Sequence, residues 1–144
     1  MNNKTIFLGG TCAKNDWRVE LIDKLQKEGV DTTPLFNPVV SGWTEAFQAV
    51  EDEAKETCAL MVYYIADPKQ EGNPISAYSM IEASMALYDD PERTVVVFES
   101  DGMVDHAKKV QDKTEKDFRK RFPEANVLAN FDELVQFVKK QLAD

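Results

Sequence analysis

The chain has one histidine, His106, and two cysteines, Cys12 and Cys58, among its 144 residues. One histidine excludes metal sites built from several imidazoles, and it argues against a serine or cysteine triad, which needs a histidine base. Two cysteines far apart in the sequence do not form a disulfide framework. We therefore expect a reducing, cytoplasmic location and neither a metal ion nor another cofactor.

Long apolar runs and an excess of positive charge are also missing. No segment is long and apolar enough to cross a bilayer and no secretory leader is recognisable, so we expect no membrane association. The 17 basic and 26 acidic residues give a net charge of -9. This charge repels a phosphate backbone, so we expect no binding to nucleic acid. A small anion is still compatible, because helix N-termini and loop amides can hold one phosphate.

The remaining sequence is a regular alternation of uncharged strand-like runs and helical patterns. Its length suits one domain, 1–144, without an internal boundary. Strands are expected at 5–8, 33–36, 58–65, 94–98 and 126–128, and helices at 16–28, 44–57, 76–88, 104–121 and 131–142. Such alternation predicts a parallel sheet covered by helices on both faces. Right-handed crossovers favour a three-layer, doubly wound α/β sandwich of the flavodoxin-like type, with five strands in the order 2-1-3-4-5.

In such a sheet ligands bind beyond the carboxyl ends of the strands, where the strand order reverses. The first loop there contains Gly9, Gly10 and Thr11. The glycines would let the backbone approach a ligand and the threonine hydroxyl could bind a sugar or phosphate oxygen, although two glycines also suit a tight turn. Lys14 and Arg18 could add positive charge or simply begin a solvated helix. The dinucleotide fingerprint G-x-G-x-x-G is absent.

One carboxylate, Glu82, interrupts the otherwise uncharged helical pattern at 76–88. It borders an apolar stripe, and no lysine or arginine lies within one helical turn of it. A half-desolvated charge without a partner costs free energy and is often functional. Because Glu82 follows the loop at the predicted switch point, it is a candidate nucleophile or acid/base group. The alternative is a carboxylate that hydrogen-bonds its own loop for structural reasons.

Other ligand contacts are expected from the loops after the second and third strands. Asn37 could bind a ligand or begin an ordinary turn before Pro38. Trp43 could stack on a planar base or belong to the core. Asp67 is a candidate second carboxylate ahead of Glu82, although loop acids are usually solvated.

Four motifs occur in a fixed order: IFLGG at 6–10, DWR at 16–18, FNP at 36–38 and SMIE at 79–82. With this order the chain, over 6–98, resembles the nucleoside 2-deoxyribosyltransferase-like family. The resemblance implies that Glu82 attacks the anomeric carbon of a 2'-deoxynucleoside, with Ser79 in the position of a family threonine. A covalent deoxyribosyl enzyme would form, and a second base or water would release the sugar with retention.

The chain departs from the family where aspartates are usual, at the start of the third strand and shortly before the nucleophile. It has Cys58-Ala59 at the first place and Asn73 or Ser76 near the second. Asp67 could replace the missing acid for the leaving base, or Asn73 could hydrogen-bond that base. We thus expect Glu82 and Asp67 to be catalytic. The expected substrate-binding residues are Gly9, Gly10, Thr11, Asn37, Trp43, Asn73, Ser76 and Ser79.

The resemblance implies N-glycosidic bond cleavage or deoxyribosyl transfer on 2'-deoxynucleosides or their 5'-monophosphates, with a free nucleobase as co-substrate or product. It also implies a homo-oligomer whose subunits complete each other's sites. Two alternatives stay open. One is a nucleoside 5'-monophosphate N-glycoside hydrolase, whose phosphate site would come from Thr11, Lys14 or Arg18. The other is a non-catalytic nucleotide-binding module in which Glu82 hydrogen-bonds a ribose hydroxyl.

Overall fold

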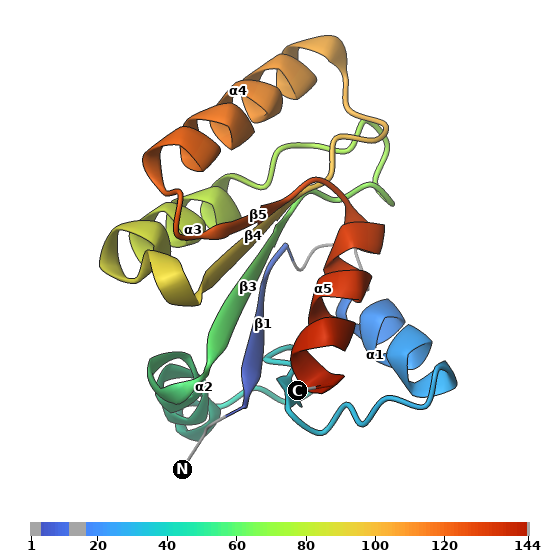
Figure 1. Cartoon of the computed structure of the whole chain (residues 1–144), viewed down its shortest axis with the longest axis vertical. Coiled ribbons are helices and arrows are strands. Elements are labelled where there is room, and N and C mark those ends of the chain that lie inside the picture. The colour runs from blue at the N-terminus through green and yellow to red at the C-terminus, as the bar shows by residue number, and fades with distance from the viewer. Residues whose placement is uncertain (1–3, 12–16, 144) are drawn as a thin grey trace.

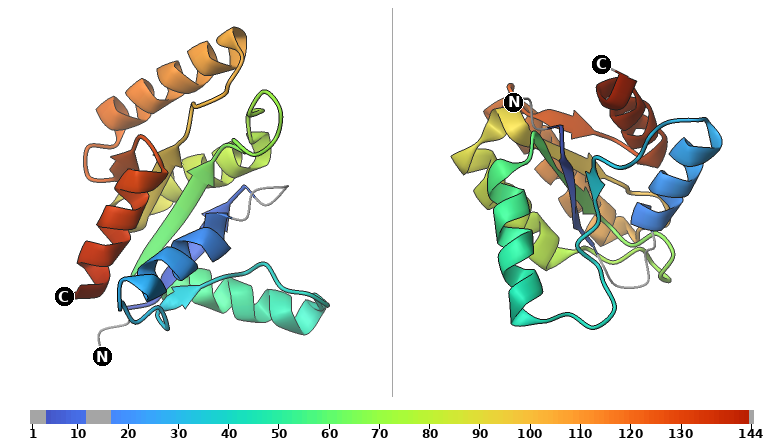
Figure 2. Two further views of the ribbon diagram at one scale, coloured as in Figure 1. Left: turned by 90° about the vertical axis from the view of Figure 1, so that its right-hand side faces the viewer. Right: turned by 90° about the horizontal axis from the view of Figure 1, so that it is seen from below.

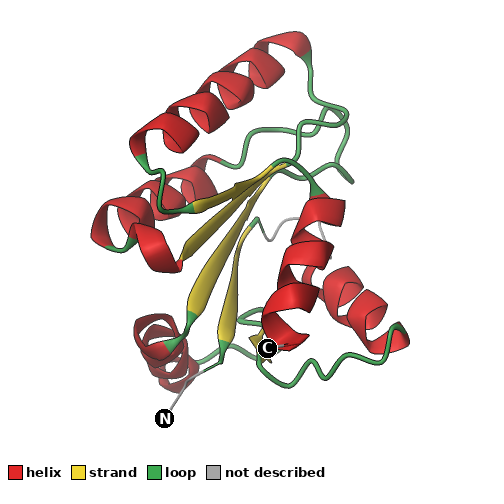
Figure 3. Cartoon of the chain, in the orientation of Figure 1, coloured by secondary structure: helices red, strands yellow, loops and turns green. Residues whose placement is uncertain are grey.

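Five parallel strands form the central sheet of the protein, seen in a computed structural model that describes residues 4–11 and 17–143 (Figures 1 and 3). The strand order is β2-β1-β3-β4-β5, which confirms the predicted order 2-1-3-4-5. The strands are β1 (Ile6–Gly10), β2 (Leu35–Phe36), β3 (Leu60–Ile65), β4 (Thr94–Phe98) and β5 (Asn126–Leu128). β1 runs on through both glycines, which the sequence had assigned to the following loop.

Helices cover both faces of the sheet, as expected for a doubly wound fold (Figure 2). One face carries α1 (Trp17–Lys27) and α5 (Phe131–Ala143). The other face carries α2 (Glu45–Thr57), α3 (Ala77–Asp89) and α4 (Asp105–Arg121), and a short 3-10 turn, η1 (Pro91–Arg93), leads into β4. Within the described residues no helix is long and apolar enough to cross a membrane.

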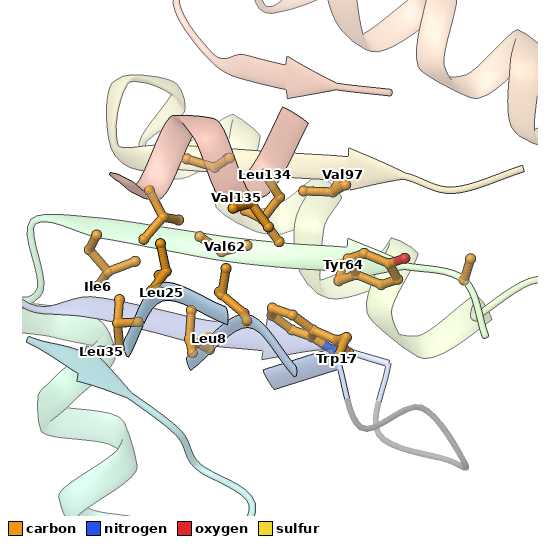
Figure 4. Packing of buried hydrophobic residues seen from close by; sticks show 14 of the residues in the cluster. Ile6, Leu8, Trp17, Leu25, Leu35, Val62, Tyr64, Val97, Leu134 and Val135 are labelled. Atoms are coloured by element: carbon orange, nitrogen blue, oxygen red, sulfur yellow. The ribbon is translucent and has the colours of Figure 1, made fainter. Parts of the chain in front are cut away.

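Two hydrophobic cores, one on each side of the sheet, fix the direction of each strand residue. On the first side the Trp17 ring stacks on Tyr64 at 5.1 Å between centroids, among aliphatic side chains of the sheet and α5 (Figure 4). On the second side Tyr63 packs with Ala83 and Leu87 of α3. Because successive strand residues point to opposite faces, neighbouring tyrosines enter different cores. Tyr63 therefore lies on the same side of the sheet as α3.

The apolar stripe of α3 lies on the outside of the protein rather than in the core. Tyr78, Ile81, Met85 and Tyr88 are 75%, 56%, 57% and 65% exposed. The buried face of α3 consists instead of small residues and one leucine: Ser79, Ala83, Ala86 and Leu87. Small side chains let the helix approach the sheet closely, which a periodicity count based on large apolar residues does not detect.

α2 is held mainly by an aromatic stack and leaves space beside α3. Phe47 of α2 stacks on Phe36, and Phe36 stacks on Phe7 of β1, with centroid distances of 6.4 and 5.5 Å. The hydroxyl of Thr44 accepts a hydrogen bond from the Phe47 N–H and caps the start of the helix. No residue of α2 is fully buried. The helix therefore covers the sheet loosely, and a pocket remains between it and α3.

Candidate functional site

Glu82 lies in this pocket, which has a volume of about 340 Å³. We call it the Glu82 pocket. Its floor is formed by Met61 and Tyr63 of β3, and its walls include Lys55 of α2 and Met85 of α3. The side chain of Glu82 is 21% exposed, so the carboxylate is largely removed from solvent. The volume falls at the lower end of the range typical of small-molecule sites.

Lys55 supplies the cation that the sequence near Glu82 lacks. Its Nζ lies 3.5 Å from Oε2 of Glu82, although the two residues are 27 positions apart. The same ammonium group lies 5.4 Å from the centroid of the Phe7 ring, which helps to hold it in place. Among the described residues, Oε1 of Glu82 makes no hydrogen bond. Within the described part of the chain, the carboxylate thus has one oxygen paired and one without a partner.

Tyr63 places a phenol on the floor of the Glu82 pocket. Its side chain is only 4% exposed, and its hydroxyl donates to the Met61 sulfur at 3.8 Å. Burial raises the pKa of Tyr63 to about 12, and the negative charge of Glu82 contributes to the shift. The phenol is therefore protonated at neutral pH and is a neutral hydrogen-bond donor. One signal in the sequence could have indicated this role for Tyr63. Adjacent residues of the predicted third strand face opposite sides of the sheet, so either Tyr63 or Tyr64 had to lie on the side of the Glu82 helix.

Arg93, at the far end of the pocket, is bound to the chain itself. Its Nε donates to Asp90 at 2.6 Å and its Nη1 donates to the Cys58 carbonyl at 2.6 Å. These contacts join the end of α3 to the beginning of β3. Cys58 is buried, and its pKa is raised because burial disfavours the thiolate.

Gly9 and Gly10 make room for β3 within the fold. A Cβ atom on Gly9 would lie 3.2 Å from Cε1 of Tyr63. Gly10 has a φ of +99°, and a Cβ atom there would lie 2.3 Å from the Tyr64 backbone nitrogen. Both glycines are therefore explained by close approach of the neighbouring strand. Gly9 in particular accommodates the tyrosine ring that forms the pocket floor.

Thr11 links the carboxyl ends of β1 and β3. Its N–H donates to the Tyr64 carbonyl at 2.9 Å, and its hydroxyl accepts from the Ala66 N–H at 3.2 Å. The sequence left open a role for this hydroxyl in binding a ligand oxygen. In the structure it satisfies a buried backbone donor.

Arg18 is buried rather than turned toward a ligand loop. It is 4% exposed, and its guanidinium donates to the carbonyls of Leu8, Gly10 and Thr11 at 2.7, 3.0 and 3.0 Å. The sequence had suggested that Arg18 either adds positive charge to the first loop or lies in solvent at the start of a helix. The buried guanidinium fits neither expectation. Lys14, the other cation expected there, and Cys12 lie outside the described residues.

Asn73 joins the loops that follow β3 and β4. It is fully buried, its Oδ1 accepts from the Asp67 N–H at 2.8 Å, and its Nδ2 donates to the carbonyls of Glu99 and Asp101 at 2.8 and 2.7 Å. Both amide protons are used within the chain. Asp67 is 2% exposed. Neither residue is among the described residues that line the Glu82 pocket.

The other expected ligand contacts also lie away from that described lining. Asn37 accepts a hydrogen bond from the Val39 N–H at 2.9 Å, as an Asx turn does. Trp43 is 52% exposed and so is not a core residue. Ser76 is the N-cap of α3 without a side-chain capping bond, and Ser79 lies on its buried face.

The predicted residues therefore fall into two groups instead of one pocket. Thr11, Asp67 and Asn73 lie at the carboxyl ends of the strands, whereas Glu82 faces Tyr63 over the middle of the sheet. The crossover helix α3 runs back along the sheet, antiparallel to the strands. The second turn of α3, which contains Glu82, therefore lies over the middle of the sheet rather than at the edge where the loops are.

Comparison with known proteins gives one match. The family described as nucleoside 2-deoxyribosyltransferase like matches residues 3–101. This segment includes Lys55, Tyr63 and Glu82. No curated protein and no solved structure matches the chain.

Proposed function

The chain belongs to the nucleoside 2-deoxyribosyltransferase-like family, and on this basis we propose that it cleaves or transfers at the N-glycosidic bond of 2'-deoxynucleosides or their 5'-monophosphates. The observation that carries the proposal is the state of Glu82. Its carboxylate is partly buried in an open pocket of ligand size, with Oε2 beside Lys55 and Oε1 without a hydrogen bond to the described residues. A nucleophilic carboxylate needs this combination of partial burial, charge and one accessible oxygen.

In the proposed reaction Oε1 of Glu82 attacks C1' of the sugar. The bond between C1' and the base nitrogen breaks, and its electron pair leaves with the base, which takes up a proton. A base or a water molecule then attacks C1', gives up one proton to the solvent and releases Glu82 as a carboxylate. Two inversions at C1' give overall retention.

Two groups would assist Glu82 in this scheme. Lys55 stabilises the charge that Glu82 carries before attack and after release. Tyr63, neutral at physiological pH, is a positioning residue that can donate a hydrogen bond into the pocket. Asp67 lies outside the described lining of the Glu82 pocket, so a water molecule would supply the proton for the leaving base.

Water access decides between transfer and hydrolysis. The protein should be incubated with 2'-deoxynucleosides in the presence and absence of a second nucleobase. An exchanged nucleoside identifies a transferase, whereas free deoxyribose identifies a hydrolase.

The nucleophile is tested with Glu82→Gln. This change should lower turnover by about 10³-fold or more, because an amide cannot form the sugar ester. Intact-mass spectrometry of the unchanged protein, incubated without acceptor base, should show a deoxyribosyl adduct that maps to Glu82. Glu92→Gln, a change in η1 outside the pocket lining, is the matched control. Binding of nucleosides without any adduct or turnover would instead identify a non-catalytic binding module.

A homo-oligomer is part of the proposal. Tyr78, Ile81, Met85 and Tyr88 are spaced by three, four and three residues, the seam spacing of packed helices. None of them is charged. Two copies of a chain with net charge -9 can therefore meet here without repulsion between like charges at the centre of the interface. Met85 also borders the Glu82 pocket. A second copy bound to the stripe would approach the pocket mouth.

A further inference from the structure

The described lining of the Glu82 pocket carries more negative than positive charge. Four acidic residues line it besides Glu82: Asp52 and Glu56 of α2, and Asp89 and Asp90 at the end of α3. We call these four residues the carboxylate rim. With Glu82 they make five carboxylates, against the two cations Lys55 and Arg93. The formal excess is therefore three negative charges.

Both cations of the pocket already have carboxylate partners. Lys55 pairs with Glu82 at 3.5 Å, and Arg93 pairs with Asp90 at 2.6 Å while also binding the Cys58 carbonyl. A phosphate that entered the pocket would have to displace one of these carboxylates. The attraction gained between the phosphate and one of these cations would thus be offset by the loss of that cation's ion pair with its carboxylate.

Arg18, one of the two cations expected to serve a phosphate at the first loop, is not available either; Lys14, the other, lies outside the described residues. Its guanidinium is buried and donates to three backbone carbonyls. Turning it toward a ligand would leave those carbonyls without their donors, which is costly in a buried position.

We propose that the Glu82 pocket selects unphosphorylated nucleosides and rejects their 5'-monophosphates. The proposal rests on the function proposed above and specifies its substrate class. A 5'-phosphate carries between one and two negative charges at neutral pH. The rim repels this charge within a Debye length of about 8 Å, whereas it has no net effect on an uncharged nucleoside.

Salt dependence tests the proposal on the unchanged protein. We would measure kcat/KM for a 2'-deoxynucleoside and for its 5'-monophosphate at low and high ionic strength. At low salt the nucleoside should be preferred by about tenfold or more. Added salt should raise kcat/KM for the monophosphate and leave that for the nucleoside almost constant. A monophosphate that is used equally well or better, or whose kcat/KM falls with salt, would overturn the proposal.

A pair of matched double variants locates the effect. Asp52→Asn with Glu56→Gln removes two rim charges from α2. Glu51→Gln with Glu53→Gln removes two charges from the same helix outside the described pocket lining. The first variant should lower the ratio of kcat/KM for the nucleoside to kcat/KM for the monophosphate by about threefold or more. The second variant should leave this ratio unchanged. An equal change in both variants would show that net charge, not the rim, sets the preference.

Binding measurements separate this proposal from the proposed chemistry. If neither substrate turns over, calorimetry with the same two compounds still compares their affinities. Tighter binding of the nucleoside would support charge selection even though the proposed reaction had failed. Tighter binding of the monophosphate would overturn it, and absence of binding by both would count against both proposals.

Discussion

Lys55 Nζ lies 3.5 Å from Glu82 Oε2, so the end of α2 supplies a counter-ion to the second turn of α3. The side chains are 34% and 21% exposed, which is intermediate between a surface ion pair and a buried one. This geometry gives one oxygen of Glu82 a counter-ion, while the other makes no hydrogen bond to the part of the chain that the structure describes. Four predictions test the surroundings of Glu82 and the fold that holds it.

Lys55→Met should reduce turnover because Glu82 loses the charge that stabilises its carboxylate. We expect kcat/KM to fall about tenfold, in line with the loss of one charge-assisted contact. The free energy of unfolding should change by less than about 1 kcal/mol, since the pair is partly exposed. Steady-state kinetics and thermal unfolding measure the two effects, and Lys55→Arg should restore part of the activity. Full activity of Lys55→Met would contradict the assigned role.

Tyr63→Phe should alter the alkaline stability of the protein. Folding raises the Tyr63 pKa to about 12 from its usual value near 10. The unfolded chain therefore loses this proton first, and stability conferred by the neutral phenol is lost as the pH rises from about 10 to about 12. Over that range the unchanged protein should lose up to about 2–3 kcal/mol more than the variant.

Denaturant unfolding between pH 9 and 12, roughly the window set by that pKa, measures the difference. Tyr78→Phe is the control, because Tyr78 is 75% exposed. Parallel stability profiles for the unchanged protein and Tyr63→Phe would show that Tyr63 titrates normally.

Asn73→Asp should be strongly destabilising. The change replaces the amide that donates to two backbone carbonyls with an oxygen that faces them. We expect a loss of about 3 kcal/mol, the cost typical of buried polar groups left unsatisfied. Asn37→Asp should cost less than about 1 kcal/mol, because a carboxylate oxygen can accept the same turn hydrogen bond from Val39. Equal losses in equilibrium denaturation would exclude the structural role of Asn73.

Ile81→Glu should convert the proposed oligomer into monomers. Burying the added carboxylate in the centre of the α3 stripe would cost more than the interface provides. Light scattering coupled to gel filtration measures the mass, and circular dichroism confirms that the fold is kept. Val19→Glu, at a site 60% exposed on α1, is the control and should not change the mass. A monomeric unchanged protein would refute the homo-oligomer.

The sequence predicted the architecture well because that information is local. β4 and β5 begin and end where their uncharged runs predict. The strand order followed from the right-handedness of crossover connections. The family was indicated by motifs that each lie within a short stretch of sequence. The prediction was incomplete where a feature depends on contacts between distant elements. The roles of Arg18 and Asn73 follow from which carbonyls surround them, and no spacing in the chain specifies that.

The amino-acid sequence by itself determined the layered parallel sheet and the family, and it made Glu82 the candidate nucleophile, since periodicity and short motifs are properties of neighbouring residues. Only the tertiary structure decided that Lys55 pairs with Glu82, that Tyr63 lies beneath it and that the stripe of α3 faces outward. These relations arise when helices and strands far apart in the chain pack against one sheet. The energies that select such packing are summed over many long-range contacts, and no single stretch of sequence contains them.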